Sequence, residues 1–258
     1  MAKAFAERGM SLALADIDQA KLELAREELE SLGAQVRIYP LDVADRDAVC
    51  EAVNDAKLFF GAINIVCANA GVAGNMGPLE NARVSDWDWV IDVNMKGVAY
   101  AVQACLPHLL ENPDNAHVVI TSSISGLRVY EPSRGQGMYN MCKYGLIGLA
   151  EALKVDMQPN GVGVSVLCPS VVNTNLSHSG LNRPEKYGGA LSANNDHELA
   201  NAAASGTDPL QFGRWVVKAI EQNLFYVITH PVDRELVEKR HAKIIEAFEN
   251  SSQLTSQE

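Results

Sequence analysis

His117-Val-Val-Ile-Thr-Ser-Ser123 is followed, after a loop, by Met138-Tyr-Asn-Met-Cys-Lys-Tyr-Gly-Leu-Ile-Gly-Leu-Ala150. The first stretch is a short apolar run that ends in hydroxyl side chains, which predicts a buried β-strand. The second stretch has the apolar spacing of a helix that runs to about Gln158. Because a buried strand joined to a long helix is the repeating unit of a parallel sheet, this part of the chain predicts an α/β fold.

The same alternation extends in both directions along the chain. Short apolar runs predict further strands at residues 11–15, 36–41, 63–68, 162–168 and 225–229. Helical patterns lie between them, at residues 1–8, 18–32, 45–60, 85–110, 209–222 and 232–248. We expect a doubly wound, Rossmann-like parallel sheet with helices on both faces, in a single domain over residues 1–250. The polar residues 251–258 predict a disordered tail.

Residues 173–207 interrupt this alternation. They are rich in Asn, Ser, Gly and Ala and show little hydrophobic periodicity. Long segments of this kind inside a compact domain are usually functional. We expect this segment to be a mobile lid that determines substrate choice.

Composition and charge exclude several classes of function. The chain has 258 residues and a formal net charge of −11, which disfavours binding to nucleic acid or to anionic membranes. It has no apolar run near the roughly 20 residues that span a bilayer, and no secretory signal. The five cysteines form no CxxC pair, and the six histidines lack metal-binding spacing. We therefore expect a cytoplasmic protein without a metal site.

Polar or conformationally special residues follow most of the predicted strands. They are Asp16, Asp42, Asn69, Ser123 and Pro169. In open parallel sheets, ligands bind just beyond the carboxyl ends of the strands. These positions therefore predict a rim that lines a cofactor site.

Tyr139 and Lys143 lie four residues apart, on one face of the predicted helix. A neighbouring ammonium lowers the phenol pKa from about 10, as proton exchange near neutral pH requires. Such pairs are common on helix surfaces, but Tyr139 is the only one of the seven tyrosines with Lys at this spacing. It also follows Ser122-Ser123, where one hydroxyl can bind a substrate oxygen and the other can cap a turn.

These residues belong to a set of five motifs that resembles the short-chain dehydrogenase/reductase family, in its short single-domain branch. The motifs occur in family order as Ala68-Asn-Ala-Gly71, Val93-Asn94, Ile120-Thr-Ser-Ser-Ile-Ser-Gly126, Tyr139-Asn-Met-Cys-Lys143 and Pro169-Ser-Val-Val-Asn-Thr174. Two positions depart from the family pattern, since Ala68 replaces an asparagine and Ser170 replaces a glycine. The resemblance covers nearly all of the chain.

The resemblance implies a catalytic tetrad of Asn94, Ser123, Tyr139 and Lys143. Tyr139 would act as general acid and base, and Ser123 would hold the substrate oxygen. Lys143 would lower the pKa of Tyr139 and bind the nicotinamide ribose. Asn94 would hold a water that links Lys143 to solvent, although a buried asparagine can instead bond only to backbone.

The implied cofactor is NAD, with NADP less favoured. A carboxylate at Asp16 can accept two hydrogen bonds from the adenine ribose diol, and it would repel a 2′-phosphate. The further cofactor contacts that the resemblance implies are Asp42, Val43, Asn69, Gly71, Tyr139, Lys143, Pro169, Val172 and Thr174.

The implied substrate is a small alcohol or carbonyl compound. Residues Asn182–Gly188 and Asn223–Pro231 are similar to segments of bacterial Cα-dehydrogenases, which oxidise benzylic alcohols of aryl ethers. Hydroxysteroid, polyol and 3-oxoacyl substrates fit the same scaffold.

The helices at 85–110 and 138–158 also predict an assembly. Their apolar residues lie on more than one face and include Trp87, Trp89, Val98, Ala101, Leu146 and Leu149. Because one sheet covers only one stripe of a helix, we expect a homodimer or homotetramer.

The amino-terminal region raises a second hypothesis. In this family a glycine-rich phosphate loop lies about 20 residues before the ribose-binding acid. Counting back from Asp16 passes Met1, so we expect the chain as written to lack the first strand and the glycine loop. The strands that end at Asp16 and Asn69 would then have no strand between them, and NAD binding would be weak. A catalytically silent scaffold or interaction protein with this fold is therefore the alternative to a dehydrogenase.

Overall fold

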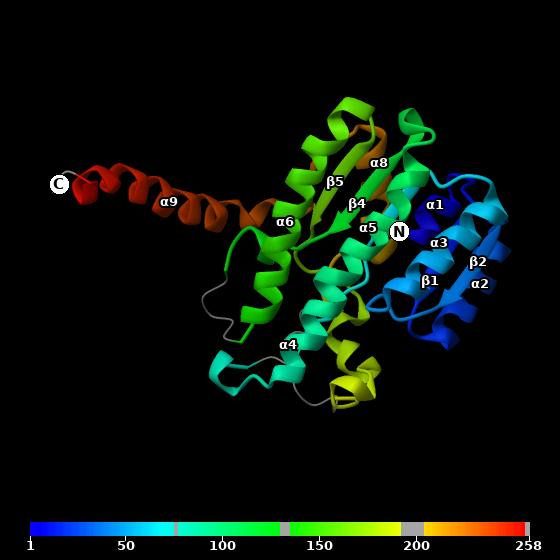
Figure 1. The fold of residues 1–258 in the computed structure, drawn as a ribbon, viewed down its shortest axis with the longest axis horizontal. Helices are drawn as coiled ribbons and strands as arrows, with labels where there is room; N and C mark the ends of the chain where they lie inside the picture. Colours follow the sequence, from blue (N-terminus) through cyan, green and yellow to red (C-terminus); the bar gives the residue numbers. More distant parts are fainter. Residues whose placement is uncertain (75–76, 130–134, 192–203, 256–258) are drawn as a thin grey trace.

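The computed structural model describes residues 1–74, 77–129, 135–191 and 204–255 (Figure 1). The strands are β1 Leu12–Asp16, β2 Val36–Pro40, β3 Ile65–Ala68, β4 His117–Thr121, β5 Gly163–Cys168 and β6 Tyr226–Ile228. The helices are α1 Ala2–Ala6, α2 Gln19–Ser31, α3 Arg46–Phe60, α4 Val84–Ile91, α5 Val98–Leu109, α6 Gly137–Met157, α8 Pro209–Glu221 and α9 Arg234–Thr255. Each predicted strand and helix is present, and apart from the last helix each lies within a few residues of its expected ends.

Local chemistry explains several of these ends. The side chain of Asp18 accepts a hydrogen bond from the backbone of Lys21 (3.1 Å), which begins α2 as an N-cap. Asp45 caps α3 in the same way, and Gly61 ends that helix in a left-handed conformation, with φ of +80°.

Four strands form the larger sheet, in the order β3-β4-β5-β6, with all neighbours parallel. Alternate residues of β4 and β5 point to opposite faces. Val118 and Val164 pack under α5 and α6, whereas Val119 and Leu167 pack against α8. The sheet is therefore covered by helices on both faces, and the predicted doubly wound α/β architecture is confirmed.

The strands β1 and β2 pair with each other in a separate sheet. Among the described residues no strand joins β1 to β3, as the sequence predicts. A cavity of about 840 Å³ lies between the two sheets and is lined by both of these strands. The edges of β1 and β3 that face this cavity have no strand partner within the described chain.

The predicted helix over residues 85–110 is present in three consecutive parts. α4 passes into a π-helical segment, η2, at Asp92–Gly97, and this segment continues into α5. π-Helical turns inside α-helices are rare and occur frequently at functional sites. Here the turn contains Asn94, one of the residues of the predicted tetrad.

The apolar residues that predicted an assembly are largely used inside the chain. Trp89, Val98 and Leu146 are 1%, 3% and 1% exposed, and Ala101 and Leu149 pack against the same core. These residues therefore do not argue for an oligomer, because the sheet and the neighbouring helices already cover them. The assembly itself stays a prediction.

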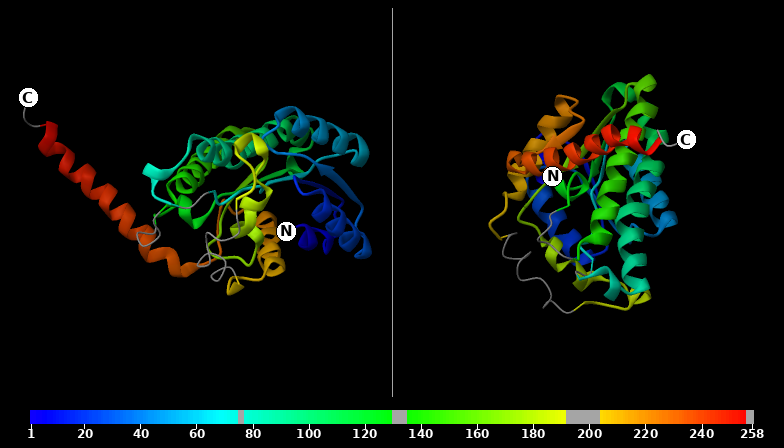
Figure 2. Two further views of the ribbon diagram at one scale, coloured as in Figure 1. Left: turned by 90° about the horizontal axis from the view of Figure 1, so that it is seen from below. Right: turned by 90° about the vertical axis from the view of Figure 1, so that its left-hand side faces the viewer.

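Helix α9 differs most from its predicted length. It projects away from the rest of the molecule and continues to Thr255 rather than ending near Phe248 (Figures 1 and 2). Neither Gly nor Pro follows Phe248 to stop the helix. Of the predicted tail, residues 251–255 are thus helical, and 256–258 lie outside the described residues. No helix in the described part of the chain combines the length and apolar character needed to cross a membrane.

Of the predicted lid, residues 192–203 lie outside the described part. Residues Asn175–Asn182 form the 3₁₀ helix η6, and Glu185–Tyr187 form a second one, η7. The mobility of the segment stays a prediction.

Candidate active site

Asn94 lies fully buried in the π-helical segment η2. Its side-chain oxygen accepts a hydrogen bond from the backbone of Val72 (2.7 Å), and its amide donates one to the Val72 carbonyl (2.8 Å). These two bonds hold the loop that follows β3 against the helix. The structure therefore places Asn94 as a bridge to backbone, which is the alternative that the sequence left open.

Gly71 lies between Asn94 and Lys143. A Cβ at this position would approach the Asn94 side-chain oxygen to 3.2 Å and the Lys143 Nζ to 3.6 Å. The absence of a side chain thus allows the loop after β3 to pass close to both Asn94 and the predicted ribose-binding lysine.

The two serines at the end of β4 have different environments. The Ser122 hydroxyl donates to the backbone carbonyl of Lys143 (2.7 Å), which ties the strand to α6. The Ser123 hydroxyl accepts from the backbone of Ser125 (3.1 Å) and lies 3.4 Å from the Pro169 carbonyl oxygen. Ser122 is thus a structural link, and Ser123 is the hydroxyl at the predicted site.

Tyr139 and Lys143 lie on the same face of α6. Ser123 lies close enough to Tyr139 to act towards a lower pKa of the phenol. The Lys143 ammonium lies 5.5 Å from the centre of the Tyr139 ring and donates to the Thr121 carbonyl (2.9 Å). Lys143 is only 4% exposed. The structure therefore brings a serine, a tyrosine and a lysine together at the carboxyl end of β4.

Burial dominates the protonation of this pair. It raises the pKa of Tyr139 to about 12, although Ser123 acts in the opposite direction. Burial also lowers the pKa of Lys143 to about 8. The lower Tyr139 pKa that the sequence predicts is therefore absent here, because the ammonium of Lys143 points to the Thr121 carbonyl and both groups are removed from water.

The rim residues of the two sheets differ in their partners. Asp16 is exposed, lines the cavity between the sheets, and accepts a hydrogen bond from the backbone of Asp18 (2.9 Å). Asn69 accepts one from the Thr121 hydroxyl (3.0 Å) and lines the same cavity. The two residues thus lie at the edge of one cavity, on separate sheets.

Asp42 and Val43 follow β2. Asp42 accepts from the backbone of Ala44 (2.9 Å) and pairs with Lys186 at 3.1 Å. Val43 packs against Gly97 of η2, where a Cβ would be 2.7 Å from the valine side chain. Val43 therefore links the smaller sheet to the helix that carries Asn94, whereas Asp42 links it to the loop that contains Lys186.

The segment Pro169–Thr174 is organised by a residue that the sequence did not single out. His230 accepts a hydrogen bond from the backbone of Ser170 (3.3 Å), and its other ring nitrogen lies 3.1 Å from the Thr207 hydroxyl. Val172 forms a β-bridge with Thr207. No spacing signal marks His230 as a link between Ser170 and Thr207, because these two partners lie 60 and 23 residues away from it.

Ser170 fits this turn without backbone strain. Among the described non-glycine residues only Asn223 has a positive φ, so the glycine of the family motif is not needed here for a left-handed conformation. Thr174, at the end of the segment, precedes η6 and makes no side-chain cap bond.

Comparisons with known proteins agree with this geometry. The family model described as short chain dehydrogenase matches residues 1–184. The chain belongs to the short-chain dehydrogenase family. This membership accounts for the five motifs and for the confirmed doubly wound fold.

Three similar proteins illustrate the range of the family. A C alpha-dehydrogenase from Sphingobium sp. is 30% identical over 95% of this chain and 81% of its own length. A short chain dehydrogenase/reductase from Burkholderia phymatum, solved in complex with NAD, has a TM-score of 0.88 at 33% identity. The match covers 95% of this chain and 90% of that one. LigO from Sphingobium sp. has a TM-score of 0.78 at 32% identity, covering 96% and 82% of the two chains.

Proposed function

We propose that this chain is an NAD-dependent oxidoreductase that interconverts a secondary alcohol and a ketone. The observation that carries the proposal is the cluster of Ser123, Tyr139 and Lys143 at the carboxyl end of β4, with the Lys143 ammonium buried beside the tyrosine ring. Hydride transfer from an alcohol needs a group that removes the hydroxyl proton at the same carbon. Of the two hydroxyls in the cluster, the Tyr139 phenol is far more acidic than the Ser123 alcohol, so Tyr139 is the group that can exchange that proton.

The roles of the residues follow from their positions. The Ser123 hydroxyl holds the substrate oxygen, and Tyr139, as phenolate, accepts the proton from that oxygen during oxidation. In the reverse direction the Tyr139 hydroxyl returns this proton to the carbonyl oxygen. In the proposed reaction Lys143 would stabilise the phenolate by its positive charge, which requires the ammonium to turn from the Thr121 carbonyl towards Tyr139. A bound nicotinamide cofactor would supply the acceptor for the hydride of the carbinol carbon.

The residues present fit a nicotinamide cofactor at two points. The Lys143 ammonium, next to Gly71, suits the hydroxyls of the nicotinamide ribose, and the exposed carboxylate of Asp16 suits the adenine ribose diol. A carboxylate at Asp16 disfavours a 2′-phosphate, which supports NAD over NADP. The Burkholderia phymatum relative was solved with NAD, which further supports this choice.

We propose benzylic alcohols of aryl ethers as the substrate class. The similarity to a C alpha-dehydrogenase over 95% of the chain supports this proposal. The segment Asn182–Gly188, which resembles a segment of those enzymes, begins at the end of η6 and contains η7.

A second candidate, a catalytically silent protein with this fold, is favoured by one observation. The cavity of about 840 Å³ separates Asp16 and β1 from β3, so a cofactor that reached from Asp16 to Lys143 would cross this gap. A scaffold role would require neither NAD binding nor proton exchange at Tyr139.

The absorbance of reduced nicotinamide distinguishes the two candidates. The purified chain is mixed with NAD and a panel of aryl alcohols, beside Tyr139→Phe and the control Tyr144→Phe. Loss of the Tyr139 hydroxyl should lower kcat by about 10²- to 10⁴-fold. The Tyr144 hydroxyl is buried without a hydrogen-bond partner, so its removal should leave turnover nearly unchanged. Absence of turnover in the unmodified chain would favour the scaffold.

A further inference from the structure

Residues 180–191, here called the clamp loop, form a closed turn beside the site. The carbonyl of Gly180 accepts hydrogen bonds from the backbone of both Arg183 (3.3 Å) and Leu191 (2.9 Å), so the two ends of the loop meet there. Gly188 and Gly189 have φ of +104° and +76°, which allows the chain to reverse after η7. The backbone of the loop is therefore defined locally, but these bonds do not attach it to the rest of the protein.

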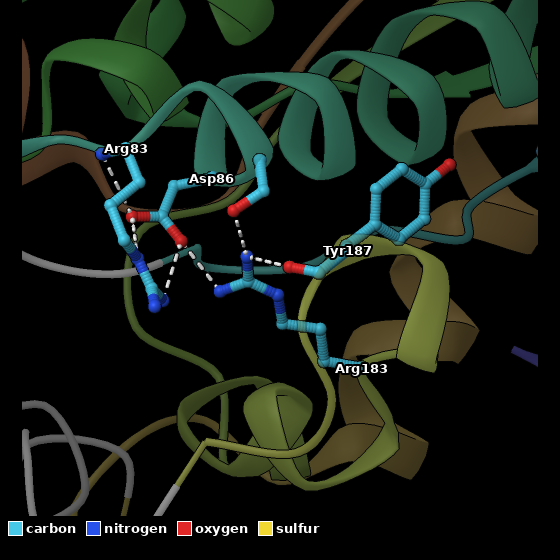
Figure 3. Close-up of polar contacts among 5 residues, drawn as sticks. Arg83, Asp86, Arg183 and Tyr187 are labelled. Carbon is cyan, nitrogen blue, oxygen red and sulfur yellow. Dashed lines mark hydrogen bonds and ion pairs between the residues drawn. The ribbon is translucent and has the colours of Figure 1, made fainter.

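Arg183 attaches the clamp loop to helix α4 (Figure 3). Its Nη1 donates to the carboxylate of Asp86 (2.6 Å), and both side chains are 0% exposed. Its Nη2 donates to the Ser85 hydroxyl (3.1 Å) and to the carbonyl of Tyr187. The guanidinium also lies 5.2 Å from the centre of the Trp89 ring.

The chemistry of this contact is specific to arginine. A buried charge is stable only when it is paired and hydrogen-bonded, and the planar guanidinium satisfies partners in three directions at once. A lysine at this position has one nitrogen and cannot reach the carboxylate, the hydroxyl and the carbonyl with the same geometry. The loop therefore has one preferred position on α4.

In this position the loop region contacts the elements that carry the predicted catalytic residues. The Tyr187 hydroxyl donates to Asp92 (2.7 Å), which begins the π-helical segment of Asn94. Just before the loop, the Ser179 hydroxyl accepts from the backbone of Ala73 (3.1 Å). Ala73 adjoins Val72, to which Asn94 is bonded.

The remaining ion pair of the loop is weaker. Lys186 lies 3.1 Å from Asp42, but its side chain is 53% exposed, and exposed pairs contribute little because water screens them. The position of the loop thus depends chiefly on Arg183.

We propose that Arg183 is a positioning residue, which through its buried pair with Asp86 holds the clamp loop against α4 and thereby shapes the place where the alcohol binds. The effect on substrate rests on the proposed function. The effect on the loop does not, since it follows from contacts that exist in the protein without a substrate.

The chain offers a matched control for this proposal. Arg83 also contacts the Asp86 carboxylate (3.2 Å), but its side chain is 59% exposed, and the residue is the N-cap of α4 rather than part of the loop. Arg183→Met and Arg83→Met therefore each remove one positive charge beside the same carboxylate. Only Arg183→Met should release the loop. Arg183→Lys is a milder variant in case Arg183→Met folds poorly.

Amide hydrogen exchange of the full chain tests the loop directly. We expect Arg183→Met and Arg183→Lys to lose protection over residues 180–191 while β4 and β5 keep theirs, and Arg83→Met to match the unmodified chain. Unchanged protection of the loop in both Arg183 variants would overturn the proposal, whether or not the chain is an enzyme. Loss of protection across β4 and β5 as well would also overturn it, because Arg183 would then serve the stability of the whole fold.

The kinetic test depends on turnover in the unmodified chain. If turnover is present, kcat/KM for the alcohol should fall about 10- to 100-fold in Arg183→Met, as expected for a misplaced substrate, and remain near normal in Arg83→Met. The pH profile of kcat should keep its shape, because Tyr139 and Lys143 are untouched. A loop that loses protection without any fall in kcat/KM would refute the role in substrate positioning.

Discussion

Replacing Lys143 by Met should make the protein inactive without making it less stable. Lys143 is 4% exposed, and burial lowers its pKa from 10.5 to about 8. At neutral pH the residue is still charged, so the folded state bears the cost of holding an ammonium out of water. The difference in pKa corresponds to on the order of 3 kcal/mol. Met keeps the aliphatic stem and removes this cost.

One favourable contact is lost in the same substitution. Lys143 donates to the Thr121 carbonyl (2.9 Å), and a hydrogen bond from a charged group contributes about 1.5–3 kcal/mol. The two effects oppose each other, and the desolvation cost is at least as large. We therefore expect the free energy of unfolding of Lys143→Met to exceed that of the unmodified protein by about 0 to 2 kcal/mol.

The difference in stability between the two proteins should change with pH in a defined direction. The folded pKa of Lys143 lies below its unfolded value, so the unfolded chain binds the proton more tightly between the two pKa values. The unmodified protein should gain stability relative to Lys143→Met as pH rises from about 8 towards 10.5. Any stability advantage that the variant has at neutral pH should therefore become smaller as the pH rises.

Urea denaturation at about pH 7 and about pH 10 measures this difference. The control is Lys154→Met, at the exposed carboxyl-terminal part of α6, where the ammonium lies 4.5 Å from the Phe225 ring. Loss of an exposed contact of this kind should cost about 0.5–1 kcal/mol, with no change between the two pH values. A Lys143→Met protein that is less stable by more than about 1 kcal/mol at neutral pH would refute the reasoning. A difference from the unmodified protein that is the same at both pH values would also refute it.

Three further predictions concern the cofactor, the core and the assembly. Asp16→Ala should raise kcat/KM with NADP relative to NAD, and equal use of both cofactors by the unmodified chain would contradict the role of Asp16. His117 is buried against Ser165 (2.7 Å) and its pKa is lowered to about 4, below its unfolded value of 6.5. Stability should be complete above pH 6.5 and fall by on the order of 3 kcal/mol as pH drops towards 4, whereas thermal melts of His117→Gln should show a weaker fall. Light scattering should give the mass of a dimer or tetramer, and a monomer mass at micromolar concentration would contradict the expected assembly.

The alternation of short apolar runs and helices sufficed to predict the α/β class and nearly all of the elements. Local signals such as the Asp18 cap and the stop at Gly61 lie within a few residues of the ends they determine, so they are visible in the sequence. The Tyr139–Lys143 pair could be predicted for the same reason, since one helix carries both residues.

The partners of these residues could not be predicted in this way. Asn94 bonds to Val72 through a π-helical turn, and the burial that moves the pKa of Tyr139 and Lys143 in opposite directions exists only after α6 has packed on the sheet. The sequence predicted a lower Tyr139 pKa because it showed the neighbouring charge but not the loss of water.

The sequence by itself therefore determined the order of strands and helices, the family motifs and the hydroxyl, phenol and ammonium groups available for proton exchange. Only the tertiary structure decided that Arg183 pairs with Asp86, 97 residues away, that His230 links Ser170 to Thr207, and that β1 and β3 lie on opposite sides of a cavity. The physical reason is that helix and strand signals act between residues a few positions apart. Ion pairs, cavities and desolvation, in contrast, depend on which distant segments come into contact and exclude water.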